Sequence, residues 1–496
     1  MERYDALVNE KNDLFGRLKT LLEEVPPHFL MLGLVLVLVV LALGLFGRRR
    51  ELLFLLITSA MLSGAMWKGI DTGSTLFRWI LLALLAANVL RMHTYFGLPM
   101  LLFLMYVFLG FGLIAFSSVF MWSLQTGGLF LITSLAAVAL ADEMKDVKGV
   151  RRILIFYLIG TLVWIFLGAT SLNRLVAAKE AQEIGRFSGA IVSVVVFATV
   201  GGLMLPISVW AALNDRFSMV VRLLTGLMAM FIVVMLFSSG ERSGTFAGIL
   251  GTVPILARKR IAGLAFVVGA VVVLGLAGMQ LGRVNQKQWK YRLERFTSTD
   301  LTGRNQIWSD AVYECMQKPW MGHGLGSDRE FALKYLRPTH NAYLSAWYTH
   351  GIFGLLLYIG AIVAAMWQSL IVMWRGRTQE ERDIGRVLLG VLIVEAAIGM
   401  FDTFSSPSNF ATITMVLVFV MVGRMSALIK APLPSTAHAG NYYWAWVPQV
   451  TAGTGIQGAA VATGPVAGGQ AGSRPRIQVK MGRAVGRAPT PRPQGA

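Results

Sequence analysis

Long apolar runs constrain this chain more than any other feature. A helix needs about 20 mostly apolar residues to cross a bilayer. Hydrophobic residues make up 55% of the 496 positions and charged residues only 14%, whereas soluble domains have about 25% charged residues. The chain is therefore predicted to be an all-α polytopic membrane protein. The apolar runs are 28–46, 51–67, 76–91, 98–121, 125–141, 151–171, 190–213, 220–238, 245–257, 261–281, 351–374, 385–402 and 410–429.

Basic residues exceed acidic ones, with a formal net charge of +19. A nucleic-acid partner is one explanation of such an excess. Short cytoplasmic loops of membrane proteins are also rich in Lys and Arg, and here the basic residues do not form one soluble face. The clusters 48–50, 151–152, 258–260 and 375–386 are accordingly predicted to be cytoplasmic. This orientation gives about twelve core transmembrane helices, while 28–46 either crosses as an extra segment or does not cross fully.

Five regions follow from this pattern. The chain carries one large hydrophilic insertion, and its two ends differ in composition from the apolar core. Its single cysteine, Cys315, excludes a disulfide scaffold. The predicted regions are an amphipathic N-terminal segment (1–27), transmembrane helices (28–281), a large and partly helical outer loop (282–350), three closing transmembrane helices (351–430) and a disordered basic cytoplasmic tail (431–496).

The outer loop 282–350 contains ten Lys and Arg residues against six Asp and Glu residues. Positive charge on this side does not assist membrane insertion. The excess therefore predicts an anionic ligand at the outer face.

Three arginines on the predicted outer side are candidates for binding that anion. Arg242 lies among small residues in the turn 239–244, where backbone N–H groups and a helix start favour phosphate. Arg186 precedes an outward helix end, and Arg304 follows a glycine at a predicted helix start. Arginine binds phosphate through two parallel N–H groups. The alternatives are that Arg242 pairs with Glu241 or reaches headgroups, that Arg186 is interfacial, and that Arg304 only ends a solvated helix.

His340 and Asn341 lie where the outer loop re-enters the membrane. A neutral imidazole can take a proton near neutral pH, as a general base must, and Asn341 can fix neighbouring groups. Asp402 lies at the outer end of a later helix and can support the site. The alternative is that His340 caps a helix. The six histidines form no helical pair with an acid, so no metal or other cofactor is expected.

The order of these elements is distinctive. An Arg-Ser-Gly turn at Arg242 precedes Gly303-Arg304, then Gly-His-Gly-Leu-Gly at 322–326, Thr-His-Asn-Ala-Tyr-Leu at 339–344 and Gly-Ile-Phe-Gly at 351–354. This order resembles the bacterial superfamily of O-antigen ligases, O-antigen polymerases and protein O-oligosaccharyltransferases. The resemblance covers roughly residues 180–430.

The resemblance implies a GT-C-like, metal-independent and inverting glycosyltransferase of lipopolysaccharide biosynthesis, active at the periplasmic face of the inner membrane. An O-antigen ligase moves the glycan from undecaprenyl diphosphate to a sugar of lipid A–core. A polymerase or protein oligosaccharyltransferase using the same donor site is the alternative, and a transporter of lipid-linked glycans is a further one. By resemblance, Arg186, Arg242 and Arg304 bind the diphosphate, His340 is catalytic, and Asn341, Glu241 and Asp402 support them.

Overall fold

The computed structural model describes residues 37–44, 47–62, 68–91, 95–169, 193–284, 290, 294, 303–403 and 407–430. The chain divides into two units, Met1–Leu433 and Pro434–Ala496, and all described residues lie in the first. The predicted amphipathic segment 1–27, most of the run 28–46 and the predicted tail 431–496 lie outside the described residues.

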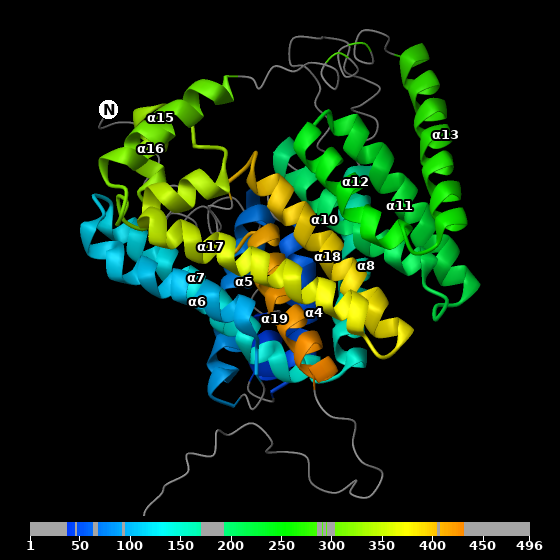
Figure 1. The fold of residues 1–496 in the computed structure, drawn as a ribbon, viewed down its shortest axis with the longest axis horizontal. Helices are drawn as coiled ribbons and strands as arrows, with labels where there is room; N and C mark the ends of the chain where they lie inside the picture. Colours follow the sequence, from blue (N-terminus) through cyan, green and yellow to red (C-terminus); the bar gives the residue numbers. More distant parts are fainter. Residues whose placement is uncertain are drawn as a thin grey trace, which may run out of the picture. The chain divides into compact units, whose positions relative to one another are not determined.

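The described part of the chain is mostly helical and contains no strand, as the apolar runs predict. Each run from 51–67 onward coincides with a helix (Figure 1). The helices of the first half are α4 (Arg49–Met61), α5 (Lys68–Ala87), α6 (Leu98–Leu113), α7 (Phe120–Ala139), α8 (Val147–Ala169), α10 (Val194–Leu213), α11 (Met219–Ser239), α12 (Arg242–Leu256) and α13 (Arg260–Val284), with short 3-10 turns η1 (Asn88–Arg91), η2 (Ile114–Phe116) and η3 (Leu140–Met144). The later helices are α15 (Arg304–Gln317), α16 (Asp328–Lys334), α17 (Ala342–Arg375), α18 (Gln379–Gly399) and α19 (Phe410–Lys430).

Among the described helices, eight are long and apolar enough to cross a membrane. The other four predicted core helices form at the predicted places but are shorter or more polar. Helix α4 has 13 residues and α12 has 15, α13 contributes the shorter apolar segment Arg260–Leu276, and α18 carries several charged residues. The 15-residue helix α12 can span where the bilayer thins locally to match it.

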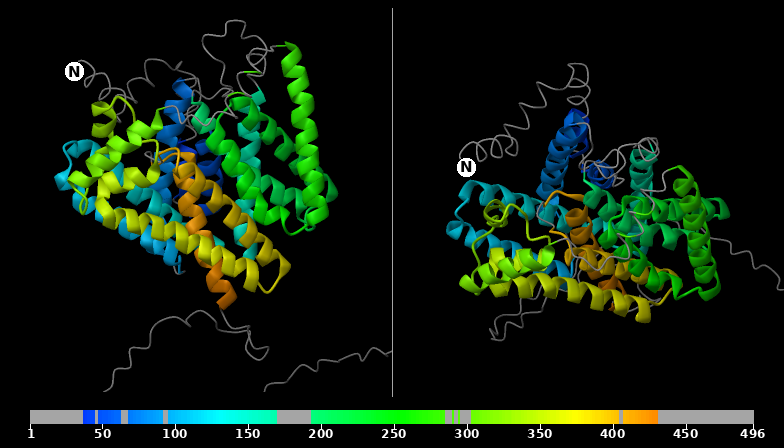
Figure 2. Two further views of the ribbon diagram at one scale, coloured as in Figure 1. Left: turned by 45° about the horizontal axis from the view of Figure 1, so that its top comes forward. Right: turned by 90° about the horizontal axis from the view of Figure 1, so that it is seen from above.

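Helices α10 and α19 form the centre of the first unit, since nearly all their residues are buried. Helix α10 packs against α11 and α12, and α17 packs against α6, α18 and α19. Helix α13 lies at the edge and exposes Ile261, Leu264 and Val271 (Figures 1 and 2). A continuous apolar outer surface of this kind is typical of contact with lipid.

Helix α12 approaches both of its neighbours through glycine. A Cβ atom on Gly244 would lie 2.6 Å from the Ala198 carbonyl oxygen of α10. A Cβ atom on Gly390 of α18 would lie 2.2 Å from the Gly251 carbonyl oxygen of α12. Small residues allow helix backbones to come this close inside a membrane. The turn that carries Glu241 and Arg242 is thereby held firmly at the start of α12.

Helix α17 is broken at Gly351, which has φ 66° and ψ −170°. The break leaves the carbonyls of Tyr348 and Thr349 free for other donors, and they accept hydrogen bonds from the N–H groups of His323 (2.7 Å) and Gly324 (3.0 Å). The glycine-rich turn 320–326 therefore docks into the break in α17. Only glycine fits at position 351, because a Cβ there would lie 2.0 Å from the Trp320 carbonyl oxygen.

Candidate active site

His340 lies between the outer segment and α17, in a backbone conformation that residues other than glycine seldom adopt. Its φ is 46°, in the left-handed region. The next residue, Asn341, caps α17 by accepting hydrogen bonds from the N–H groups of Tyr343 and Leu344, both at 3.0 Å. Asn341 thus fixes the start of α17, and its supporting role at the site stays a prediction. Because Asn341 is the cap, the alternative in which His340 caps the helix is wrong.

Asp402 faces His340 from the end of α18. The His340 Nδ1 and Asp402 Oδ1 atoms are 4.0 Å apart, and both side chains are partly buried. This separation is too long for a hydrogen bond, but it lets the carboxylate attract a protonated imidazole. The Thr403 N–H donates to Asp402 Oδ1 at 2.9 Å and fixes its orientation. Burial raises the pKa of Asp402 to about 6.

Arg304 begins α15, directly after Gly303 in a left-handed conformation (φ 76°). This confirms the helix start predicted at Gly303-Arg304. The guanidinium carbon of Arg304 lies 5.9 Å from the centre of the Phe401 ring, one residue before Asp402. One turn along α15, the Trp308 Nε1–H donates to the Thr339 carbonyl at 3.1 Å, and its ring lies 6.3 Å from that of Phe401. Trp308 thus joins the segments that carry Arg304, His340 and Asp402.

Glu241 and Arg242 come from the turn between α11 and α12. Glu241 occupies the N-cap position of α12, is 4% exposed, and accepts a hydrogen bond from the Ser243 hydroxyl at 3.1 Å. Its charge raises the pKa values of both His340 and Asp402, so this turn faces the same site. Arg242 follows as the first, half-buried residue of α12.

The electrostatics of the site favour a neutral imidazole. Burial lowers the pKa of His340 most, and the positive charges of Arg304 and Arg337 lower it further. A histidine with a lowered pKa is unprotonated at neutral pH and can accept a proton.

The structure brings together most of the predicted site residues and adds others. Of the predicted set, Glu241, Arg304, His340, Asn341 and Asp402 gather at one end of the helices, and Arg242 follows Glu241 directly. Arg186 lies outside the described residues, so its place at the site stays a prediction. Sequence reasoning missed Arg337, Trp308 and Phe401. The signal for Arg337 is its position three residues before His340, but it is one of ten basic residues in the loop.

No group of three or more His, Cys, Asp or Glu side chains is placed to hold a metal ion within the described ranges. The expectation that the protein needs no metal or other cofactor stays a prediction, because this geometry does not test it.

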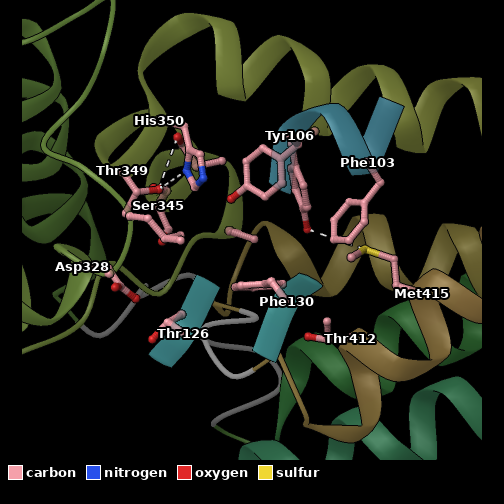
Figure 3. A pocket seen from close by; sticks show the side chains of 15 residues that line it. Phe103, Tyr106, Thr126, Phe130, Asp328, Ser345, Thr349, His350, Thr412 and Met415 are labelled. Carbon is pink, nitrogen blue, oxygen red and sulfur yellow. Dashed lines mark hydrogen bonds between the residues drawn. The ribbon is translucent and has the colours of Figure 1, made fainter. Parts of the chain in front are cut away.

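A separate cavity of about 50 Å³, lined mostly by apolar side chains, lies under the first part of α17 (Figure 3). Its wall includes the polar residues Asp328, Thr349 and His350 together with Phe103 and Met415. Burial raises the pKa of Asp328 to about 6. A cavity of this size accommodates a few water molecules and is too small for a sugar.

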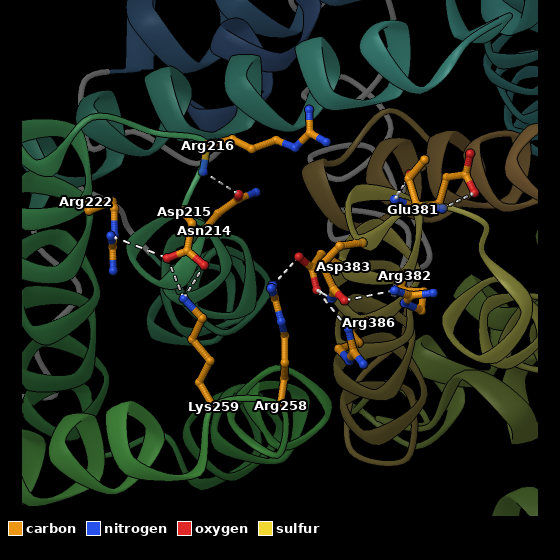
Figure 4. A network of polar contacts seen from close by, with 12 residues as sticks. Asn214, Asp215, Arg216, Arg222, Arg258, Lys259, Glu381, Arg382, Asp383 and Arg386 are labelled. Atoms are coloured by element: carbon orange, nitrogen blue, oxygen red, sulfur yellow. Dashed lines mark hydrogen bonds and ion pairs between the residues drawn. The ribbon is translucent and has the colours of Figure 1, made fainter. Parts of the chain in front are cut away.

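A network of charged residues lies at the opposite end of α12 and α18 (Figure 4). Asp383 pairs with Arg258, and with Arg386 at 2.8 Å. Glu380 pairs with Arg151 and Arg216, each at 2.8 Å. Arg151, Arg258 and Arg386 belong to clusters predicted to be cytoplasmic. The candidate site and the basic loops therefore lie at opposite ends of the same helices.

The fold and site together define a polytopic helical membrane protein with a charged polar site at the end remote from its basic loops. Residues 203–359 match the model of the family described as O-antigen ligase. A stretch of 109 residues is 30% identical to an O-antigen ligase of Pseudomonas aeruginosa. That alignment covers 21% of this chain and 25% of the relative. The resemblance to the O-antigen ligase superfamily is confirmed over residues 203–359, which include Arg242, Arg304 and His340.

Proposed function

We propose that this protein is an O-antigen ligase. It transfers a glycan from undecaprenyl diphosphate to a sugar hydroxyl of lipid A–core at the periplasmic face of the bacterial inner membrane. The observation that carries the proposal is the convergence of His340, whose pKa is lowered, with Asp402 at 4.0 Å and with Arg304, which lies over Phe401 next to Asp402. His340 and Arg304 both fall within the stretch that matches the ligase family.

In this mechanism the arginines hold the diphosphate and stabilise the charge that grows on it as its bond to the anomeric carbon breaks. His340 accepts the proton of the acceptor hydroxyl while the new glycosidic bond forms. Because Nδ1 faces Asp402, Nε2 is the nitrogen available to the acceptor. Attack from the face opposite the diphosphate inverts the anomeric carbon, and undecaprenyl diphosphate leaves.

In-vitro transfer tests the proposal. The purified protein receives an undecaprenyl-diphosphate glycan and, separately, lipid A–core, a second lipid-linked glycan or a pilin-like protein, with and without a chelator. The expected product forms on lipid A–core alone, is insensitive to the chelator, and is absent with His340→Ala. Product on either other acceptor assigns the protein to the polymerase or the protein oligosaccharyltransferase branch of the superfamily instead. Binding of donor without any product contradicts the enzyme and favours a transporter.

A further inference from the structure

Arg337 lies in the outer segment just before His340. Its side chain is exposed and reaches back to the start of α15, since a Cβ built on Gly303 would lie 3.3 Å from Arg337 Nη1. Gly303 directly precedes Arg304. The chain thus returns after α15 and α16 to place the Arg337 guanidinium beside the residue that precedes Arg304.

The two guanidinium groups share one neighbourhood with His340, because both charges lower its pKa. Within the described residues, neither Arg304 nor Arg337 forms an ion pair or hydrogen bond with a carboxylate. Glu241 and Asp402 are the nearby acids, and each is engaged elsewhere: Glu241 accepts from Ser243 and Asp402 from Thr403.

The charged network at the other end of the molecule shows the contrast. There, Arg258 and Arg386 share Asp383, and Arg151 and Arg216 share Glu380. A carboxylate placed between two arginines offsets their repulsion and uses their donors. The outer pair has no such carboxylate in the described structure, so its donors remain open to an anion from outside.

We infer that Arg337 and Arg304 together form a binding site for a phosphate-type anion beside His340, in which Arg337 is a ligand-binding residue in its own right. This inference rests on the proposed function and deepens it. The anion is either the diphosphate of the donor or a phosphate on the acceptor glycan. Both present the paired oxygens that a guanidinium group binds through two parallel hydrogen bonds.

The first arm of the test measures binding without turnover. Inorganic pyrophosphate is titrated calorimetrically into the full-length protein in detergent, as wild type, Arg337→Ala, Arg337→Lys and the control Lys318→Ala. Lys318 is exposed and basic, but it follows the opposite end of α15 from Arg304. Arg337→Ala is expected to raise the Kd about tenfold, with Arg337→Lys closer to Ala than to wild type. An unchanged melting temperature shows that the variants fold.

The second arm separates the two sources of the anion. The Michaelis constants for donor and acceptor are measured for the same four proteins. A rise for the donor alone identifies the donor diphosphate as the anion, and a rise for the acceptor alone identifies the acceptor phosphate. If Arg337→Ala binds pyrophosphate as tightly as Lys318→Ala, the inference is overturned. Pyrophosphate binding that depends on Arg337, without transfer to any acceptor, supports the anion site and overturns the proposed function instead.

Discussion

His340 is held in its left-handed conformation from both sides. Asn341 caps α17 immediately after it, and Trp308 binds the carbonyl of Thr339 immediately before it. A non-glycine residue in this region costs about 1–2 kcal/mol. Such a cost persists where the surrounding structure over-determines the residue, and it concentrates at functional sites. The strain at His340 therefore supports its proposed catalytic role independently of its charge environment.

The pH dependence of transfer should follow the lowered pKa of His340. Since the neutral imidazole is the active form, kcat/KM should fall on the acid side with a midpoint below 6.5. A bound diphosphate offsets the charges of Arg304 and Arg337, so the midpoint for kcat should lie at higher pH. Steady-state kinetics between pH 5 and 8, about the range in which a histidine titrates, measure both midpoints.

Asp402 provides the control for this profile, because its own pKa is about 6. In the Asp402→Asn variant, the fall of kcat/KM on the acid side of the pH profile (the acid limb) should remain, while kcat is reduced. Loss of the limb in this variant assigns the titration to Asp402 and removes His340 as the titrating base.

Arg242→Lys tests whether the arginine at the start of α12 binds in a bidentate manner. Lysine keeps the charge but not the planar pair of donors. If both donors contact the diphosphate, Lys should reduce kcat/KM nearly as much as Ala, by at least tenfold. Activity close to wild type with lysine would mean that only a point charge is needed there.

The sequence predicts the residues whose chemistry stands out at a helix end, and the structure brings most of them together. The sequence does not distinguish Arg337 from the other basic residues of the loop. Its importance depends on the chain returning past α15, and no local pattern encodes that return.

At the scale of the helices, α15 is connected to two other segments through one side chain, Trp308. Trp308 contacts the segment before α17 and the segment after α18 while sharing its own helix with Arg304. Three segments distant in sequence are thereby set in register. The sequence predicts where α15 starts but not this bridge, since an indole in an amphipathic helix gives no sign of which carbonyl it will reach.

Trp308→Phe should separate positioning from packing. Phenylalanine keeps a ring against Phe401 but removes the donor to Thr339, a loss of about 1 kcal/mol. We expect kcat to fall about fivefold and the acid limb to move, with little change in melting temperature. The control is Trp374→Phe, since Trp374 is 64% exposed on α17. Equal effects of the two variants would remove Trp308 from its positioning role.

Gly351→Ala tests the break in α17. The positive φ and the approach of the Trp320 carbonyl should cost about 2 kcal/mol or more and lower the melting temperature measured in detergent. The control is Gly360→Ala in the same helix, where a Cβ would meet only Leu102 Cδ1 at 3.7 Å. That variant should be neutral or slightly stabilising. A similar melting temperature for both variants would contradict the docking of turn 320–326.

At the scale of the whole molecule, the charged network and the candidate site lie at opposite ends of the same helices, α12 and α18. Helix α18 carries Asp383 near its start and is followed by Asp402, while α12 begins at Arg242 and is followed by Arg258. The hydropathy and charge of the sequence predict this two-ended arrangement. They do not predict which carboxylate each arginine contacts, since that depends on how the helices pack.

Asp383→Asn should therefore destabilise the protein without altering catalysis. It removes a buried charge shared by Arg258 and Arg386, at a cost of about 2 kcal/mol. The melting temperature should fall while the Michaelis constants stay unchanged. The control, Asp215→Asn, changes a carboxylate that is 59% exposed and should have a smaller effect. A change in donor KM with Asp383→Asn would show that the two ends are coupled.

The docking of turn 320–326 into α17 also dictates an order of assembly. The bonds from Ile352 to Pro319 and from Gly324 to Thr349 join groups that the ribosome adds about thirty residues apart. With the predicted orientation, the outer segment must pass through the bilayer before its partner helix enters it. In that orientation, the segment carrying Arg304 and His340 is therefore tethered only through the preceding helix α13 until α17 inserts.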